Sequence, residues 1–141
     1  MNLREIAKTY IGTPHRNGGD LKGVALDCCS LITHLYQEAG YGKIPITFGY
    51  SNNWFCKQHT EELMLPYLEK YFYRKEKAEI GDCITYRWGR AEYAHISMVI
   101  DDGIVIHCDA DDGVEITDID SPKFFDKNGR SRVSGIWGMK K

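Results

Sequence analysis

Apolar residues recur at helical spacing along the first half of the chain. A short helix is predicted over residues 2–11, where the apolar positions are three or four apart. A stronger stripe begins behind Asp27, with members at i, i+3, i+4, i+7, i+8 and i+11: Cys28, Leu31, Ile32, Leu35, Tyr36 and Ala39. This stripe predicts a central helix with one buried face, ended by Gly40 or Gly42.

Two other segments complete the expected first half. Residues 12–26 are too rich in glycine, asparagine and aspartate for regular structure, so we expect a loop there. The stretch from Thr60 to about Tyr71 predicts another amphipathic helix, distorted by Pro66. The first half is therefore expected to be helical, with a long loop before the central helix.

From Ile80 onward the pattern changes to short strand-like runs separated by turns. The runs cover residues 83–88, 95–101, 104–108, 114–117 and 132–138. No repeat, low-complexity segment or linker interrupts the chain, so we expect one domain over residues 1–141. Helices followed by hairpins predict the α+β class, with N-terminal helices packed on a C-terminal antiparallel sheet.

Charge and hydropathy exclude several classes of partner. The 141 residues include 18 basic and 20 acidic side chains, so no broad basic surface for nucleic acid is expected. No apolar run approaches the roughly 20 residues that span a bilayer. Residues 1–10 are charged and mixed, unlike a signal peptide, so we expect synthesis in the cytoplasm.

The cysteine pattern argues against a disulfide framework and a structural zinc site. The count is odd, two cysteines are adjacent, and no CxxC pair occurs: Cys28, Cys29, Cys56, Cys83 and Cys108. A zinc site from Cys28, His95, His107 and Cys108 stays an alternative with little support. Residues 109–113 have carboxylates, but not at the spacing of a calcium loop. We therefore expect no metal and no other cofactor.

Cys28 occupies the position in the chain best suited to a reactive thiol. Asp27 is a good N-cap, so Cys28 is expected at a helix N-terminus, whose partial positive charge favours a thiolate. A cysteine at a helix start is more often an inert packed residue, so the assignment needs a base elsewhere. Cys29 is expected to turn about 100° away from the buried stripe.

The predicted hairpin carries two histidines, and its turn decides whether they share a face. With a two-residue turn, Asp101 pairs with Ile104, and His95 and His107 point to opposite faces. Reaction chemistry that uses both side chains is then impossible.

A three-residue turn gives the other outcome. Ile100 then pairs with Ile104 and Ser97 with His107, which brings both histidines to one face as diagonal neighbours. We expect this turn, because its last position favours a left-handed residue and Gly103 supplies one.

These residues fit the logic of a catalytic triad. Cys28 is the candidate nucleophile, His95 the base beside it, and His107 the group that orients the base. The backbone N–H of Cys28 is a candidate oxyanion donor.

The same residues carry a resemblance to a known family. The segments 10–19, 26–31 and 36–40, the Ile80-Gly81-Asp82 entry and the histidine hairpin over 94–108 together resemble the NlpC/P60 cysteine peptidases. The resemblance implies a papain-like α+β fold, no metal, and hydrolysis of peptidoglycan stem peptides, typically at a D-γ-glutamyl to diamino acid bond. The segment 50–54 and the Gly135-Ile136-Trp137 ending resemble phage-tail and gene-transfer-agent members, which implies phage tail proteins as partners.

Three positions depart from the family pattern and bear on specificity. His15 stands where the family usually has tyrosine near the oxyanion and substrate, Cys29 where it has serine, and Ser30 where glycine is common. The candidate residues for substrate binding or the oxyanion site are His15, Asp27, Cys29 and Trp54. Trp54 can equally line a groove or pack internally.

Two rival functions are compatible with the sequence. The same triad could transfer an acyl group or deamidate, as in transglutaminase-like enzymes. The chain could also be a non-catalytic tail or cell-wall-binding subunit with a vestigial triad.

Overall fold

The computed structural model describes residues 2–16, 18–41 and 64–140. Its elements, in chain order, are α1 (Leu3–Lys8), β1 (Asp20–Leu21), β2 (Ala25–Leu26), α2 (Cys28–Glu38), α4 (Leu65–Tyr71), β3 (Phe72–Lys75), β4 (Cys83–Trp88), β5 (Ala91–Asp101), β6 (Ile104–Asp109), β7 (Gly113–Asp118), the 3-10 helix η1 (Pro122–Phe124) and β8 (Val133–Met139). Within the described residues, no helix has the length and apolar character needed to cross a membrane.

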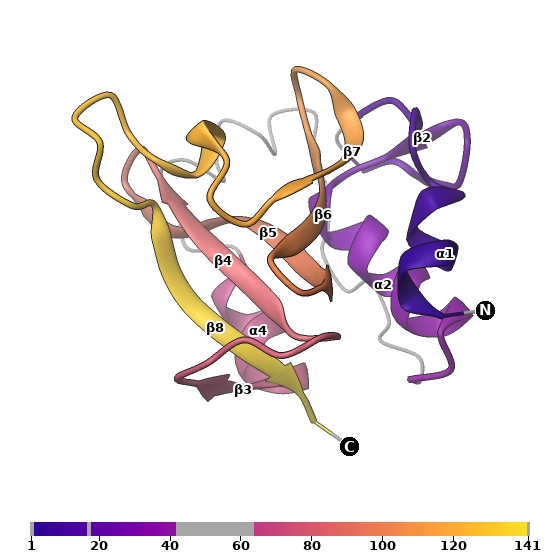
Figure 1. Ribbon diagram of the computed structural model, residues 1–141, viewed down its shortest axis with the longest axis horizontal. Coiled ribbons are helices and arrows are strands. Elements are labelled where there is room, and N and C mark those ends of the chain that lie inside the picture. The colour runs from indigo at the N-terminus through magenta and orange to yellow at the C-terminus, as the bar shows by residue number, and fades with distance from the viewer. Residues whose placement is uncertain (1, 17, 42–63, 141) are drawn as a thin grey trace.

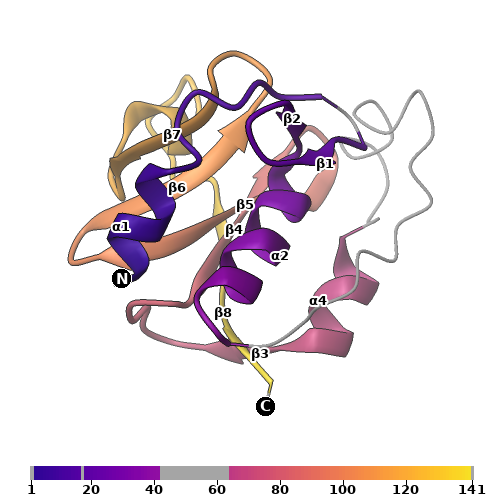
Figure 2. The same cartoon turned by 90° about the vertical axis from the view of Figure 1, so that its right-hand side faces the viewer.

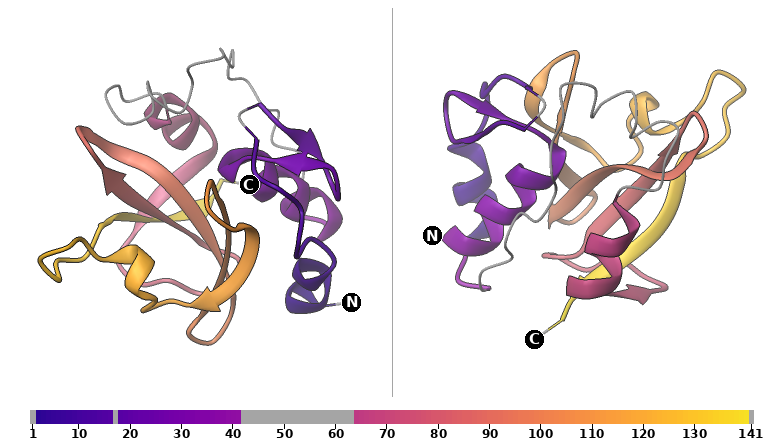
Figure 3. Two further views of the ribbon diagram at one scale, coloured as in Figure 1. Left: turned by 90° about the horizontal axis from the view of Figure 1, so that it is seen from above. Right: turned by 180° about the vertical axis from the view of Figure 1, so that it is seen from behind.

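A six-stranded antiparallel sheet forms the body of the protein (Figure 1). Its strand order is β3-β8-β4-β5-β6-β7, and β1 and β2 form a separate two-stranded hairpin. The strands curl, so that β6 and β7 come up beside the N-terminal segment (Figure 3). This arrangement confirms the predicted α+β class, with helices preceding an antiparallel sheet.

The two faces of the sheet are covered differently. On one face α2 crosses the sheet, with α1 beside it and α4 next to β3 (Figure 2). The main core lies there and includes Leu31, Leu35, Ile96 and Ile106. On the opposite face Phe124 of η1 closes a smaller core over Ile84, Tyr86, Val99 and Val105. The strands near α2 are therefore covered on both sides, which holds their side chains in fixed positions.

Most predicted elements occur, with corrections at their ends. The first helix covers residues 3–8 rather than 2–11, and α2 ends at Glu38, just before Gly40. Within the described residues the later helix begins at Leu65, with Pro66 in its first turn rather than as a distortion. The expected start at Thr60 lies outside the described residues.

Three short strands, β1, β2 and β3, were not predicted. The loop expected over residues 12–26 contains the β1–β2 hairpin, whose two-residue strands are too short to leave a pattern in sequence. Strand β3 directly follows α4 and pairs with the distant β8. Its partner is remote in sequence, so no local signal marks it.

The β5–β6 hairpin combines features of both turns considered above. Asp101 pairs with Ile104 around a two-residue turn, which corrects the expected pairing of Ile100 with Ile104. A register shift between Val99 and Asp101 then absorbs one residue, so that Ser97 faces His107 as predicted. The bulge therefore allows a tight Asp-Gly turn and still places both histidines on one face.

Candidate active site

The site is built around the N-terminus of α2. Asp27 accepts a hydrogen bond from the Ser30 backbone N–H at 2.8 Å, and the Ser30 hydroxyl accepts one from the Asp27 N–H at 2.9 Å. This reciprocal capping box fixes the first turn of the helix. Ser30, one of the departures from the family pattern, thus has a structural role, and Cys28 is held at the first helical position.

The residues before Asp27 are tied to the N-terminal loop and to the sheet. Leu26 donates from its N–H to the Pro14 carbonyl at 3.0 Å, and its own carbonyl accepts from the Arg16 N–H at 3.0 Å. The Cys108 thiol of β6 also donates to the Leu26 carbonyl, at 3.3 Å. These bonds fix the helix start relative to the histidine hairpin.

Cys28 opens into a cavity of about 150 Å³. The lining comes from α2, β4, β5, β6, the turn between β6 and β7, and η1: Cys28, Trp88, Ala94, His95, His107, Asp109, Ala110, Asp111, Lys123 and Phe124. Cys28 is 4% exposed and lines this cavity. The three predicted catalytic side chains, Cys28, His95 and His107, therefore share one recess.

The Cys28 thiol is acidic for a buried cysteine. The hydrogen bond from Cys29, whose sulfur lies 4.0 Å away, and then the hydrogen bond and charge of His95 lower the pKa of Cys28 to about 6, against the opposing effect of burial. The same bond, with burial, raises the pKa of Cys29, so that Cys29 stays a thiol. These interactions favour the thiolate form of Cys28, with Cys29 as its hydrogen-bond donor.

His95 and His107 contact each other directly. The Nε2 atom of His95 lies 2.9 Å from Nδ1 of His107, with the two rings 82° apart. Phe124 packs against the His107 ring, and the Tyr86 ring stacks on that of Phe124 with their centroids 4.4 Å apart. His95 thus has its Nδ1 side left for Cys28 and its Nε2 side bound to His107, which is the order that a triad requires.

His107 is bound on its other nitrogen by Glu115 of β7. Its Nε2 lies 2.8 Å from the Glu115 Oε1, and the two residues are direct partners in the β6–β7 pairing. His107 is 1% exposed, and burial lowers its pKa, opposed by the Glu115 hydrogen bond. Burial therefore favours the neutral form of His107.

Lys123 lies beside Glu115, on the side of His107 that faces away from His95. The Nζ atom of Lys123 lies 2.8 Å from Glu115 Oε1 and 2.8 Å from Asp109 Oδ2, and it also pairs with Asp112. These carboxylates raise the pKa of Lys123, against the effect of burial. Lys123 is therefore the cation of a three-carboxylate cluster behind His107.

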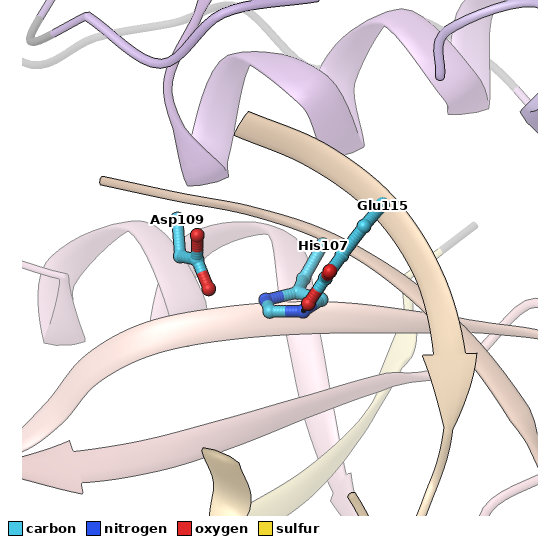
Figure 4. A group of neighbouring side chains, drawn as sticks. All are labelled: His107, Asp109 and Glu115. Atoms are coloured by element: carbon cyan, nitrogen blue, oxygen red, sulfur yellow. Dashed lines mark hydrogen bonds and ion pairs between the residues drawn. The ribbon is translucent and has the colours of Figure 1, made fainter. Parts of the chain in front are cut away.

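One group of described residues has ligand atoms close enough for a metal ion. Side-chain atoms of His107, Asp109 and Glu115 lie within 4.8 Å of one another, and Figure 4 shows the three side chains converging from β6 and β7. Lys123 already supplies the positive charge at two of them, and both ring nitrogens of His107 have protein partners. The arrangement fits an ion-pair network better than a metal centre, and the absence of a metal stays a prediction.

The predicted substrate-binding residues lie in different environments. His15 is half-buried in the loop that precedes β1, where its backbone pairs with Leu26. Burial lowers the pKa of His15, and the charge of Asp109 acts in the opposite direction. Asp27 is buried in the capping box. Trp54 lies outside the described residues, as does Cys56. The roles of His15, Asp27 and Trp54 in binding stay predictions.

Cys29 lies in the main core and does not turn outward. It is 1% exposed, because the side of α2 that carries it packs on α4, where Tyr67 interacts with Thr33 and Cys29. The angle from the stripe and the second helix were both predicted, but the position of α4 beside Cys29 was not. In this position Cys29 is placed to hydrogen-bond Cys28 rather than to contact a substrate.

Glu115 and Lys123 were not among the residues selected from sequence. A signal for Glu115 was available, because counting back from the turn at 109–113 pairs it with His107. Lys123 approaches from a connection without regular pairing, so no sequence period marks it.

Comparison with known proteins was made for sequence and for structure. The model of the NlpC/P60 family matches residues 12–132. No curated protein matches the sequence. Solved structures do match, and they share the fold.

Three similar structures illustrate the likeness. An NlpC/P60 family protein from Bacillus cereus ATCC 10987 is 24% identical, with a TM-score of 0.62 over 96% of this chain and 38% of that chain. The NlpC/p60 domain of peptidoglycan hydrolase SagA is 16% identical, with a TM-score of 0.59 over 99% and 96%. NlpC1 from Trichomonas vaginalis is 19% identical, with a TM-score of 0.58 over 96% and 43%. The chain thus spans less than half of two of these chains and nearly all of the third.

Proposed function

Because the chain belongs to the NlpC/P60 family, we propose that it is a cysteine peptidase or amidase that hydrolyses bacterial cell-wall peptides. The observation that carries the proposal is the thiol of Cys28, acidic at a helix N-terminus and followed by His95 and His107 in one recess. The likeness to the NlpC/p60 domain of peptidoglycan hydrolase SagA supports the substrate class.

The first half of the reaction forms an acyl-enzyme. The Cys28 thiolate attacks the carbonyl carbon of the scissile amide and forms a C–S bond, while the negative charge moves to the oxygen, near the Cys28 N–H. His95, protonated beside the thiolate, donates its proton to the leaving nitrogen, and the C–N bond breaks. A free amine leaves, and a thioester on Cys28 remains.

The second half releases the acid product. Neutral His95 takes a proton from water as the water oxygen attacks the thioester carbon. The C–S bond then breaks, which yields a carboxylic acid and restores the Cys28 thiolate beside protonated His95. Throughout, the hydrogen bond to His107 orients the imidazole of His95.

The proposed bond is the D-γ-glutamyl to diamino acid linkage of the stem peptide. The resemblance of the sequence motifs to the NlpC/P60 peptidases supports this choice. The test is mass spectrometry of purified muropeptides digested by the wild type and by Cys28→Ala. We expect new products only with the wild type, with masses that identify the broken bond. An intact wild-type digest would contradict the proposal and favour the binding-subunit alternative.

Acyl transfer is separated from hydrolysis by the acceptor. The same digest is repeated with a primary amine in excess. Hydrolysis is expected to give the free acid in both reactions. Amide adducts that replace the acid would instead identify a transferase, and loss of a side-chain amide alone would identify a deamidase.

We also propose that the protein is made in the cytoplasm and assembled with a phage or prophage tail. The resemblance of residues 135–137 and 50–54 to tail-associated members supports this assignment. Antibodies to the chain are expected to label the tails of phage particles released from the source cells. Label confined to the cell fraction would contradict it.

A further inference from the structure

Glu115 contacts the histidine pair through a carboxylate oxygen. Its Oε1 lies 2.8 Å from Nε2 of His107, whose Nδ1 faces His95 at 2.9 Å. The Glu115 side chain is 27% exposed and that of His107 only 1%, so this contact is largely shielded from water. The tautomer of His107 is therefore set by its protein neighbours rather than by solvent.

The reaction needs one particular tautomer of His107. When His95 is protonated beside the thiolate, its Nε2 carries a hydrogen that must be accepted by Nδ1 of His107. A neutral imidazole accepts at Nδ1 only when its proton is on Nε2. The other tautomer would place two N–H groups against each other across 2.9 Å.

Glu115 selects between these two forms. An ionised carboxylate only accepts hydrogen bonds, so it requires a proton on Nε2 of His107. We propose that Glu115 is a positioning residue that holds His107 as the Nε2–H tautomer and thereby keeps Nδ1 open to accept from His95. This inference rests on the proposed function of the same site. Glu115 itself acts through His107 and contacts neither Cys28 nor the reacting atoms.

Lys123 supports the choice of the Nε2–H tautomer of His107. Its ammonium lies 2.8 Å from the same Glu115 oxygen that faces His107, and it also pairs with Asp109 and Asp112. The positive charge keeps a carboxylate next to a neutral histidine favourable. It also opposes protonation of His107, which would remove the acceptor at Nδ1.

Two substitutions of similar length separate this role from packing and from simple charge pairing. Glu115→Gln keeps a carbonyl oxygen that can accept from both His107 and Lys123, but it removes the charge. Glu115→Met fills the same space without an acceptor. Asp118→Asn, an exposed position on the same strand, is the matched control for loss of one negative charge.

The primary measurement is ¹⁵N–¹H correlation of the histidine side chains in the folded protein, with thermal unfolding recorded for each variant. We expect Nε2–H for His107 in the wild type, Glu115→Gln and Asp118→Asn. In Glu115→Met, the Nδ1–H form should appear. Muropeptide hydrolysis should show kcat about tenfold lower in Glu115→Met, with KM within about twofold, and near-normal kcat in Glu115→Gln.

Other results would overturn the inference. A proton on Nδ1 of His107 in the wild type would do so, as would an unchanged tautomer in Glu115→Met. Equal losses in Glu115→Gln and Glu115→Met would instead assign charge pairing with Lys123. Because the tautomer is read without substrate, the inference can be judged even if the wild type cleaves no muropeptide, which would overturn only the proposed function.

Discussion

His95 and His107 are joined edge to face, Nε2 to Nδ1, because a one-residue bulge shifts the register of the two strands that carry them. Without that shift, the tight turn at residues 102–103 would place the two rings on opposite faces of the sheet. The bulge near Val99 therefore determines that His95, beside Cys28, has a second histidine behind it.

Alkylation should report the acidity of Cys28. Because its pKa is lowered to about 6, the rate of labelling by iodoacetamide should rise through pH 6 and level off by neutral pH. The ordinary value of 9.0 predicts a rise only at alkaline pH. Labelling followed by peptide mass spectrometry measures the rate at each site.

The control for this experiment is Cys28→Ala, in which the rapid phase should disappear. Buried Cys83 and Cys108, whose pKa values are raised mainly by burial, should label slowly in the same sample. If Cys28 labelled no faster than Cys83 at pH 7, the activated thiolate would be disproved.

Cys29 should tune Cys28 from inside the core. Its thiol donates to the Cys28 thiolate, so Cys29→Ala removes a bond that stabilises the ionised form, and the pKa of Cys28 should rise. Cys29→Ser keeps a donor and should stay close to the wild type. The measurement is the pH dependence of alkylation. Identical profiles for alanine and serine would exclude this role.

Gly113 should be intolerant of a side chain, and Gly103 offers a matched comparison. Both glycines have φ +68, but a Cβ at Gly113 would lie 2.5 Å from the Thr13 carbonyl oxygen, whereas Gly103 has nothing within 4 Å. Gly103→Ala should cost about 1–2 kcal/mol of unfolding free energy from backbone strain alone. Gly113→Ala should lower the unfolding free energy by more than this and reduce activity, because the loop of Thr13, Pro14 and His15 must move.

Urea unfolding and muropeptide hydrolysis of the two glycine variants test this difference. Equal destabilisation in both would mean that the close approach of Thr13 to Gly113 contributes nothing.

Lys123 should set the pH at which kcat/KM falls on the acid side of its pH profile, the acid limb. Burial lowers the pKa of His107, and the Lys123 charge lowers it further. In Lys123→Met the pKa of His107 should rise, so protonation begins at higher pH and removes the acceptor for His95. The acid limb of kcat/KM should then move to higher pH. Lys127→Met, an exposed lysine nearby, should leave the profile unchanged.

A shift of the same size in both lysine variants would indicate a general charge effect. An unchanged acid limb in Lys123→Met would show that Lys123 does not influence the protonation of His107.

The sequence predicted the parts of the site that depend on local periodicity. Asp27 as N-cap and the stripe behind Cys28 both follow from the spacing of a helix, and they are confirmed. The shared face of His95 and His107 also follows from a period of two along strands, once the register is known. The predicted pairing of Ser97 with His107 was correct, but that of Ile100 with Ile104 was wrong, because the turn has two residues and a bulge absorbs the third.

The parts that sequence missed depend on contacts between distant segments. Cys29 lies one helical step off the apolar stripe, and only the packing of α4 shows why it is buried. Lys123 reaches the site from the three-residue 3-10 helix η1, which is too short to leave a helical spacing in the sequence. Such contacts form by tertiary packing, which leaves no periodic signal in the chain.

Strand β8 has a consequence for how the protein is made. It lies between β3 and β4, although among the described strands of the sheet residues 133–139 are synthesised last. During synthesis, β4 keeps one edge unpaired until β8 arrives, and such an edge invites pairing with other chains. Completion of the sheet, and with it the rigid support for β5 and His95, therefore waits until β8 has been synthesised.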